Sequence, residues 1–448
     1  MAQKYKYLHL VNYNTFLLWD IKRYFMTQVA SSHPIVKLGD YIQEEGTKYN
    51  ISDKTKTYGI LGVNNQTGIF DAYEENGSKI KQKYKKMQVG WIAYNPYRVN
   101  VGSIGIRTEE HLFEYISPAY VVFSCKKGLL PKFLFLLMKT DLFNKIIREN
   151  TTGSVRQNLN YSVLSNLQIP LPSLEEQKNI VSTYNAKIEQ ANIYSLCTYR
   201  INKKIEDYLH NILETNIEFD ISGSFLNYVN YKDISRWDAL FLLSNNNIKS
   251  KYPLATLGQC ISHFLTDQNG KSLRRETYKT PEKEYTYIGM ENVKKETGEI
   301  IDNVIVKGKD IKSQTIYVPS NYFLYGKLRP YLNKYWYNNI ETQQEEIICS
   351  SEFFVFDIKN NINSKYFLYV LASYIVQKQI IDAMSGARMP RISEETFRGI
   401  QIPLPPLNIQ NEIVEHIDVL RKEQKDLQQK ALTLRQQATQ QFEQTIFN

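Results

Sequence analysis

The chain has 448 residues, 42% hydrophobic and 13% aromatic, which is enough apolar material for two domains with separate cores and argues against disorder. Its 55 Lys and Arg residues against 46 Asp and Glu give a net charge of +9, which favours a polyanionic partner. No apolar run approaches the roughly 20 residues of a membrane span, no signal-peptide pattern opens the chain, and the four cysteines lie far apart. We therefore expect a cytoplasmic protein with no membrane contact.

Elements of both kinds are predicted in each half of the chain. Strands rich in aromatic and β-branched residues are predicted at 89–94, 120–124, 316–318 and 353–356, and helical segments at 131–149 and 364–384. Their order in a sheet does not follow from the sequence.

One passage occurs twice. Residues 168–181 return 233 positions later as 401–414, and nine of the fourteen positions are identical. Each copy opens a long stretch without proline or glycine, so each copy is predicted to end one module and begin a helix.

The repeat extends beyond this passage. Residues 131–137 match 364–370 at the same offset, and two further pairs recur near the start of each half: Trp19-Asp20 with Leu38-Gly39, and Trp237-Asp238 with Leu257-Gly258. Copies of over two hundred residues indicate duplication of a domain rather than a solenoid.

The two expected helices carry an apolar seam at alternating spacings of three and four. In the second helix the seam is Ile413, Ile417, Leu420, Gln424, Leu427, Ala431, Leu434, Ala438 and Gln441. In the first it is Val181, Tyr184, Ile188, Ala191, Tyr194, Thr198, Ile201, Ile205, Tyr208 and Ile212, with one slipped step around Ala191. Because each seam needs a partner, we expect an antiparallel coiled coil.

The expected fold class is α+β, with two similar mixed α/β domains separated by the two long helices and related by a pseudo-two-fold axis. Such a protein suits DNA, whose own local two-fold axes match a symmetric reader with two half-sites.

Three elements carry a resemblance to a known family. They are the repeated segments 169–181 and 402–414, the motif at 325–334, and its variant at 95–98 with 102–105. Over essentially its whole length the chain resembles the specificity subunit of a type I restriction-modification system.

The resemblance implies a DNA reader without catalytic activity. Residues 1–172 and 216–405 would be target-recognition domains, each reading one half of a bipartite double-stranded DNA site, and 173–215 and 406–448 the conserved helices. The helices would dock two methyltransferase subunits, and motor-nuclease subunits would join them. S-adenosylmethionine, Mg²⁺ and ATP would belong to those partners, so no cofactor is expected here.

Candidate DNA contacts follow from residue type. The run 79–86 holds Lys79, Lys81, Lys83, Lys85 and Lys86, a pattern that suits phosphate contacts as well as a solvated loop. Base reading favours forked side chains and nearby cations, which predicts Arg98, Arg156, Gln157, Asn158, Arg274, Arg275, Lys327, Arg329, Arg388 and Arg391. Arg329 could equally be a structural arginine of its motif.

No catalytic or metal-binding pattern is recognised. The segment 95–97 approaches an amino-methyltransferase motif but lacks its second proline, and Leu265 stands where a phosphate loop would need glycine. The six histidines show no ligand spacing.

Two other interpretations stay open. The chain could serve a type II bifunctional restriction-methylation enzyme, or it could be a coiled-coil scaffold that binds no DNA. A scaffold would bind its partners with little dependence on salt, whereas DNA binding depends on it steeply.

Overall fold

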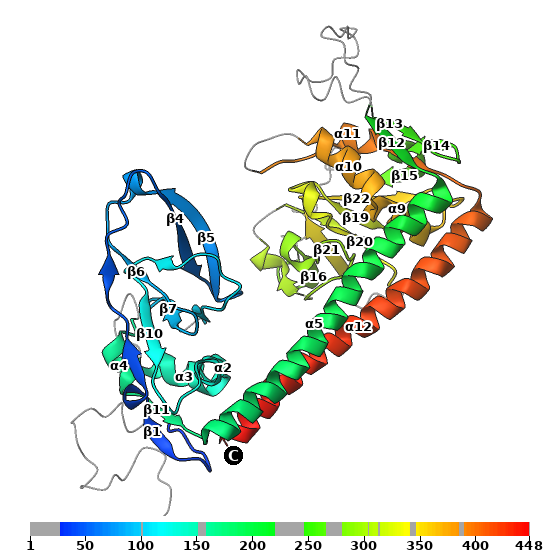
Figure 1. Ribbon diagram of the computed structural model, residues 1–448. Helices are drawn as coiled ribbons and strands as arrows, with labels where there is room; N and C mark the ends of the chain where they lie inside the picture. Colours follow the sequence, from blue (N-terminus) through cyan, green and yellow to red (C-terminus); the bar gives the residue numbers. More distant parts are fainter. Residues whose placement is uncertain are drawn as a thin grey trace, which may run out of the picture. The chain divides into compact units, whose positions relative to one another are not determined.

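The computed structural model describes residues 27–99, 102–150, 158–219, 246–265, 280–302, 304–311, 314–340, 346–384 and 389–447. The chain forms two compact units, Met1–Ser195 with Gln428–Asn448, and Leu196–Leu427. The long helices α5 (Leu174–Leu213) and α12 (Leu407–Phe447) each contribute a part to both units (Figure 1). With 40 and 41 residues, they confirm the expected helices. The domain boundaries expected from the sequence stay a prediction.

The first unit holds three sheets. They are the pair β1 (Ile35–Lys37) and β11 (Gln168–Pro170), the four-stranded sheet β2 (Ile42–Glu44), β10 (Val121–Cys125), β7 (Ile92–Tyr94), β8 (Ile104–Ile106), and the five-stranded sheet β3 (Lys48–Tyr49), β6 (Tyr84–Lys86), β9 (Tyr115–Ile116), β4 (Thr57–Val63), β5 (Ile69–Asn76). Its short helices are α2 (Pro131–Lys139), α3 (Asp141–Asn150) and α4 (Tyr161–Ser165).

The second unit holds corresponding elements. They are the pair β14 (Leu254–Thr256) and β23 (Gln401–Pro403), the sheet β15 (Ile261–Phe264), β22 (Phe353–Ile358), β19 (Phe323–Gly326), β20 (Tyr335–Tyr337), and the sheet β17 (Val304–Lys307), β16 (Glu284–Ile288), β21 (Glu346–Ser350), β18 (Thr315–Tyr317). A further pair is β12 (Asn216–Phe219) and β13 (Asn246–Lys249), and the helices are α7 (Leu257–Cys260), α9 (Ser364–Ala372), α10 (Tyr374–Ala383) and α11 (Glu394–Gly399).

Both units share one strand arrangement, which the sequence could not give. In each unit the last strand pairs antiparallel with a strand near the start of the globular domain, β11 with β1 and β23 with β14. Each mixed sheet contains one parallel pair, β4 with β9 and β16 with β21. All four strands expected from the sequence are present, as β7, β10, β18 and β22. The domain duplication is therefore confirmed at the level of topology, while the Trp-Asp pairs at 19–20 and 237–238 lie outside the described residues.

The helical segments expected at 131–149 and 364–384 are each two helices. The breaks fall at Thr140 and Ser373, which have extended backbones with ψ of 152° and 162°. Each hydroxyl donates to the carbonyl three residues earlier, at 2.7 and 2.6 Å. This bond closes the last turn of the first helix and lets the chain turn before the second.

A glutamine of the repeated passage is buried at the start of α5. Gln177 has no exposed surface, and its side-chain amide donates to the carbonyls of Gly128 and Pro172, both at 2.9 Å. Its Oε1 accepts the N–H of Leu130 at 2.8 Å, the N-cap residue of α2. One side chain therefore joins the long helix, the proline segment before it and the start of the helix pair.

Gln410 makes the corresponding bonds in the second unit. It is 2% exposed, donates to the carbonyl of Pro405 at 2.8 Å and accepts the N–H of Asn363, the N-cap of α9, at 2.8 Å. The glutamine shared by the two copies of the repeat thus has one structural role in both domains.

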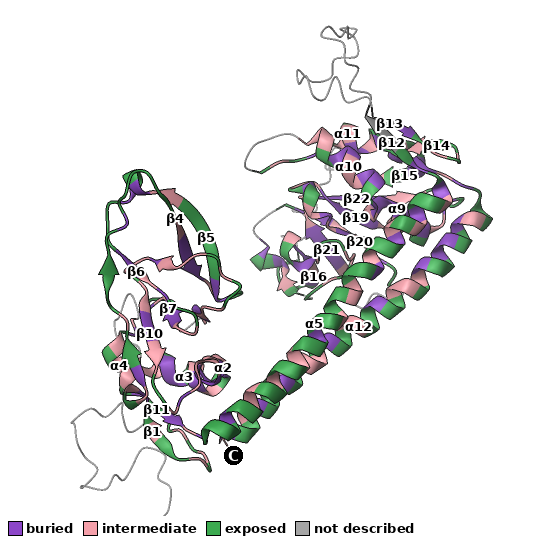
Figure 2. Cartoon of the chain, in the orientation of Figure 1, coloured by how far each residue is buried: buried purple, intermediate pink, exposed green. Residues whose placement is uncertain are grey.

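Each domain core also includes residues of both long helices, and in the first unit those of α12 come from the other end of the chain. Phe442 and Ile446 of α12 are buried in the core of the first unit, where Phe442 lies 5.8 Å from the ring of Phe133. In the second unit the end of α5 packs beside the start of α12, with Ile205 and Ile413 in one core (Figure 2).

The seam expected along α12 is buried or half-buried from Ile413 to Ala438. Its last expected position, Gln441, is exposed. At this end of the helix, Phe442 and Ile446 pack in the core of the first domain instead. On α5 the buried positions near the end are Leu209 and Leu213 rather than Tyr208 and Ile212.

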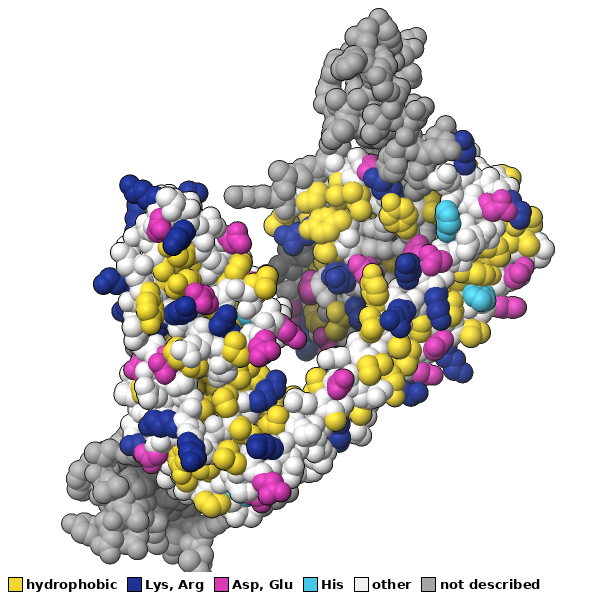
Figure 3. Space-filling model, viewed as in Figure 1, with side chains coloured by type: hydrophobic (Ala, Val, Ile, Leu, Met, Phe, Trp, Pro, Cys, Tyr) yellow, Lys and Arg dark blue, Asp and Glu magenta, His cyan; other side chains and the backbone are white. Residues whose placement is uncertain are grey.

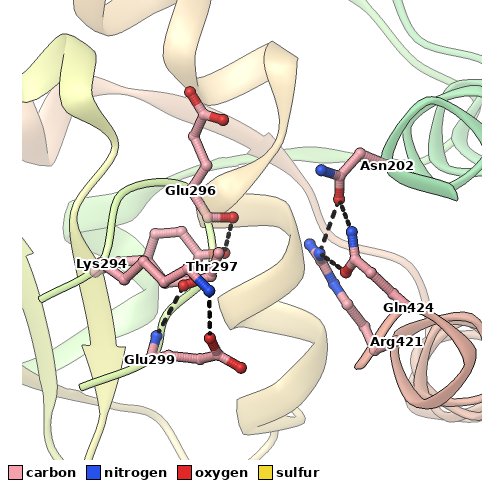
Figure 4. A network of polar contacts seen from close by, with 8 residues as sticks. Asn202, Lys294, Glu296, Thr297, Glu299, Arg421 and Gln424 are labelled. Carbon is pink, nitrogen blue, oxygen red and sulfur yellow. Dashed lines mark hydrogen bonds and ion pairs between the residues drawn. The ribbon is translucent and has the colours of Figure 1, made fainter. Parts of the chain in front are cut away.

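Polar contacts fix the pairing of the two long helices. Gln424, 6% exposed, donates to Asn202 Oδ1 at 2.7 Å, and Arg421 donates to the same oxygen at 3.0 Å (Figure 4). Arg435 donates to Asn192 Oδ1 at 3.1 Å. Residue numbers therefore increase along α12 while those of the partner residues decrease along α5. The helices therefore run antiparallel, as expected, and a buried amide inside a seam specifies its register.

Replacing Gln177 or Gln410 by Leu is expected to lower the free energy of unfolding by about 3 kcal/mol, because buried N–H and carbonyl groups lose their partners. Urea unfolding of the full chain would measure it. Gln190 and Gln440, exposed on the same helices, are matched controls, and their Leu variants should change stability little. Equal losses in all four variants would contradict the structural role.

Candidate nucleic-acid interface

A tight loop follows β19 in the second unit and begins with Lys327. This residue is half-buried: its N–H donates to the Glu352 carbonyl and its ammonium to the Ser351 carbonyl, both at 2.8 Å. The ammonium also lies 5.0 Å from the ring centre of Phe354. Lys327 therefore anchors the start of the loop to the turn before β22. Its ammonium group contacts the protein and does not point to solvent.

Arg329, two residues later, is exposed and has a left-handed backbone with φ of 49°. Its N–H donates to the carbonyl of Pro390 at 2.8 Å, and the N–H of Ile392 donates to the carbonyl of Lys327 at 3.2 Å. The Arg329 guanidinium has no hydrogen bond or ion pair with the residues that the structure describes. A strained arginine on a pinned loop, with its donors directed to solvent, is typical of a binding residue.

Arg391 lies on the segment that fastens this loop. Its Nε and one terminal nitrogen bind the two carboxylate oxygens of Glu352, at 3.1 and 2.9 Å. The hydrogen bond with Glu352 raises the pKa of Arg391. Because the guanidinium of Arg391 already binds Glu352, this arginine stabilises the base of the loop. Arg329 is therefore the stronger candidate for contact with a ligand.

The corresponding loop of the first unit joins β7 to β8. Arg98 donates its N–H to the carbonyl of Asn95 at 3.0 Å and accepts the N–H of Ser103 at its own carbonyl, at 3.1 Å. The Asn95 side chain accepts the N–H of Tyr97 at 3.0 Å. These bonds close the loop, and the Arg98 side chain is exposed at its surface.

One backbone bond relates the two loops. The N–H of Leu159 donates to the carbonyl of Pro96 at 3.0 Å, as that of Ile392 does to Lys327. When the two loops are aligned by this bond, Arg98 corresponds to Arg329, and the half-buried Asn158 corresponds to Arg391. Each unit thus presents one exposed arginine at the same place, and a guanidinium can bind a guanine edge with two hydrogen bonds.

The lysine run at 79–86 divides into exposed and internal members. Lys85 is 6% exposed and donates to the carbonyl of Tyr120 at 2.8 Å, and burial lowers its pKa. Lys86 forms a 3.0 Å ion pair with Glu114, and the hydrogen bond to that carboxylate raises its pKa. The structure thus places Lys85 inside the five-stranded sheet rather than at the surface. The exposed members are Lys79, Lys81 and Lys83.

Two further lysines lie beside this run and were not singled out from the sequence. Gly77 donates its N–H to the carbonyl of Lys56 at 2.9 Å, and an added Cβ at Gly77 would lie 2.0 Å from the Asp53 carbonyl oxygen. This close approach brings Lys54 and Lys56, both exposed, next to the start of the run. Figure 3 shows Lys and Arg side chains gathered at the upper end of this sheet. In the sequence, the spacing of Lys54 and Lys56 was the signal that could have identified them. Only the fold, however, brings these two lysines next to the run at 79–86.

Five predicted residues lie outside the described part of the chain: Arg156, Gln157, Arg274, Arg275 and Arg388. Their roles remain predictions. Met389 and Pro390 follow Arg388 directly, at the base of the Arg329 loop. Met389 is exposed and Pro390 is half-buried.

Within the described residues, no group of three or more His, Cys, Asp or Glu side chains could hold a metal ion. Among the helices that the structure describes, none combines the length and apolar character needed to cross a bilayer.

Comparison with family models gives a match to the type I restriction modification DNA specificity domain, at residues 35–194 and 260–434. These segments make up more than half of the chain. The chain belongs to this family of DNA specificity domains. Each matched segment contains one of the exposed loop arginines and one of the buried glutamines.

Individual relatives agree with the family. The type I restriction enzyme EcoDI specificity subunit of Escherichia coli is 21% identical over 327 residues, covering 71% of this chain and 68% of that protein. A solved chain described under "Structural basis underlying complex assembly and conformational transition of the type I R-M system" covers 94% of this chain and 97% of its own, with 14% identity and a TM-score of 0.52. This likeness shows a shared fold.

A type I restriction-modification S subunit from M. genitalium is also similar, at 15% identity and a TM-score of 0.43, with 93% of this chain and 97% of that one covered.

Replacing both Lys81 and Lys83 by Glu should weaken binding of the protein to all DNA sequences alike, because phosphate contacts carry no sequence information. The slope of log affinity against log salt should become shallower by about 2, one unit for each lost phosphate contact. Fluorescence anisotropy across a salt series would measure both effects.

Lys126 and Lys127 provide the matched control. Both are exposed and follow β10, at the end of that strand away from the Arg98 loop, since Val121 pairs with Tyr94. Their Glu variants change net charge equally and should leave the slope nearly unchanged. An equal effect of both double variants would attribute binding to overall charge alone.

Proposed function

We propose that each unit reads one half of a bipartite double-stranded DNA target, and that the chain acts as the non-catalytic specificity subunit of a type I restriction-modification complex. The observation that carries this proposal is the pair of equivalent loops with exposed arginines at 98 and 329. A duplicated frame with one reading loop in each copy is what two half-sites require.

The arginine loops are better suited to base edges than to phosphates. Both loops are pinned by backbone bonds at their bases, which limits where their guanidinium groups can reach. A guanidinium group held in one position can discriminate between bases through its two parallel donors, whereas phosphate contact needs only a positive charge within reach. The exposed lysines Lys79, Lys81 and Lys83 suit the second task, together with Lys54 and Lys56.

The partners in this proposal are two methyltransferase subunits on the long helices and motor-nuclease subunits beyond them. Exposed apolar side chains on α5 and α12 support a docking role for these helices, since isolated helices in solvent seldom carry so many. They include Ile193, Leu196, Tyr199, Val419 and Leu432, each between 48% and 69% exposed. S-adenosylmethionine, ATP and Mg²⁺ would be bound by those partners, in the cytoplasm.

A methylation map tests the proposal directly. A host that expresses this chain with its neighbouring methyltransferase is compared by long-read sequencing with a host expressing the methyltransferase alone. A bipartite adenine-methylated motif that needs this chain is the expected result. Absence of any such motif, with both proteins folded and abundant, would favour a scaffold without DNA recognition.

Arg98→Ala and Arg329→Ala should each relax a different half of that motif. Loss of a two-bond contact to a base costs about 1–3 kcal/mol of discrimination, or roughly 5- to 150-fold. Arg329→Lys, which keeps the charge and loses the fork, should relax the same half-site as Arg329→Ala. A motif that stays fully specified in these variants would contradict the assignment of these two arginines.

A further inference from the structure

Each arginine loop is tied by one side-chain hydrogen bond to the end of a helix. In the second unit, Asn333 Nδ2 donates to the carbonyl of Ala372, the last residue of α9, at 2.7 Å. Asn333 is 5% exposed and has a left-handed backbone with φ of 46°. It is separated from Arg329 by the single turn Pro330–Leu332, whose carbonyl at Pro330 accepts the Asn333 N–H at 3.0 Å.

The first unit makes the same connection with the donor on the helix. Lys139, the last residue of α2, donates from Nζ to the carbonyl of Gly102 at 2.8 Å. Lys139 is half-buried, and its ammonium lies 5.8 Å from the ring centre of Phe135. Gly102 has φ of 86° and belongs to the loop that carries Arg98.

The helix ends used by these two bonds are also bound to the long helices. Directly after them, the N–H of Asp141 donates to Glu443 of α12 at 2.9 Å, and that of Tyr374 donates to Glu206 of α5 at 3.0 Å. Each arginine loop is therefore connected through one helix junction to a carboxylate of a long helix, by different side chains in the two units.

We propose that Asn333 and Lys139 are positioning residues for DNA recognition, which hold the loops of Arg329 and Arg98 in the orientation that discriminates between bases. This inference rests on the proposed function. A reading side chain must be held within about 0.5 Å of its productive geometry by its supporting contacts. A loop released from its helix end keeps its charge and its contact with phosphates, so discrimination falls while affinity for DNA in general persists.

Asn333→Gly is the first test, because glycine accepts the left-handed backbone and removes only the bond to Ala372. In the methylation map, half-sites with one altered base should become methylated about tenfold more often, in the half that Arg329→Ala relaxes and not in the other. Asn333→Asp, which keeps the size and loses the donor, should act in the same direction.

Asn321 is the matched control in the same domain. It has φ of 66°, is exposed, and accepts the Tyr337 hydroxyl at 3.0 Å, before β19 rather than after it. Asn321→Gly removes a comparable bond at the opposite end of the strand and should leave both half-sites specified.

A double-mutant cycle separates positioning from a general structural role. Once Arg329 is replaced by Ala, Asn333→Gly should relax the half-site less than about twofold further, because both changes remove the same contact. A structural role alone would lower the melting temperature and add its full effect to that of Arg329→Ala.

The first unit allows a parallel test. Lys139→Met keeps the aliphatic stem and loses the bond to Gly102, and should relax the half-site that Arg98→Ala relaxes. Lys132→Met is its control, because Lys132 lies 5.4 Å from the same Phe135 ring on the same helix and makes no hydrogen bond to the described part of the loop.

The outcomes separate this inference from the function on which it rests. Relaxation by Asn333→Gly that is non-additive with Arg329→Ala supports positioning. Relaxation by Arg329→Ala alone, with Asn333→Gly silent or additive, overturns positioning and leaves the proposed function standing. If Arg329→Ala itself changes neither half-site, the reading role of Arg329 fails and the inference fails with it.

Discussion

A buried glutamine at the start of each long helix joins the three parts from which each half of the chain is built. Gln177 and Gln410 have almost no exposed surface, so their amides must be satisfied inside the protein, and each binds both the proline segment before its helix and the N-cap region of the helix pair. The strand before that segment pairs with a strand near the start of the domain. These glutamines therefore help to hold each globular domain on its long helix, together with the apolar contacts of the core.

On this common frame the two units carry different surfaces. The loop after β7 is tied to α2 by a lysine, and the loop after β19 is tied to α9 by an asparagine, although the two loops leave equivalent strands. The first unit adds an edge strand, β3, to its mixed sheet. Shared bonds in the frame and unlike contacts at the loops fit the proposal that the two units read different half-sites.

The positive charge of the chain is only partly available to a ligand. Lys85 and Lys327 donate to backbone carbonyls, and Lys86 and Arg391 bind carboxylates, so these four cations support the sheets and loops around them. Lys56 and Lys79 also form ion pairs, with Asp53 and Glu75, although both lysines are exposed. The fold therefore decides which cations can reach a ligand. A net charge of +9 therefore indicates the class of partner and leaves the contact residues undetermined.

The sequence by itself determined the duplication, the two long helices and the strands it named, because repeats, heptad spacing and β-branched runs can be read directly from the order of residues. The family followed from the resemblance of its motifs to those of known specificity subunits. The sequence could not determine strand order or the packing of Phe442 in the first core, since these depend on residues distant in sequence. The breaks at Thr140 and Ser373 rest on local hydroxyl bonds but were not recognised from the sequence. Arg98 and Arg329 were both named from the sequence, but a hydrogen bond from a segment about sixty residues away establishes their equivalence. That bond exists only once the chain has folded, which is why tertiary structure decided which charged residues are exposed on the loops and which bind other groups of the protein.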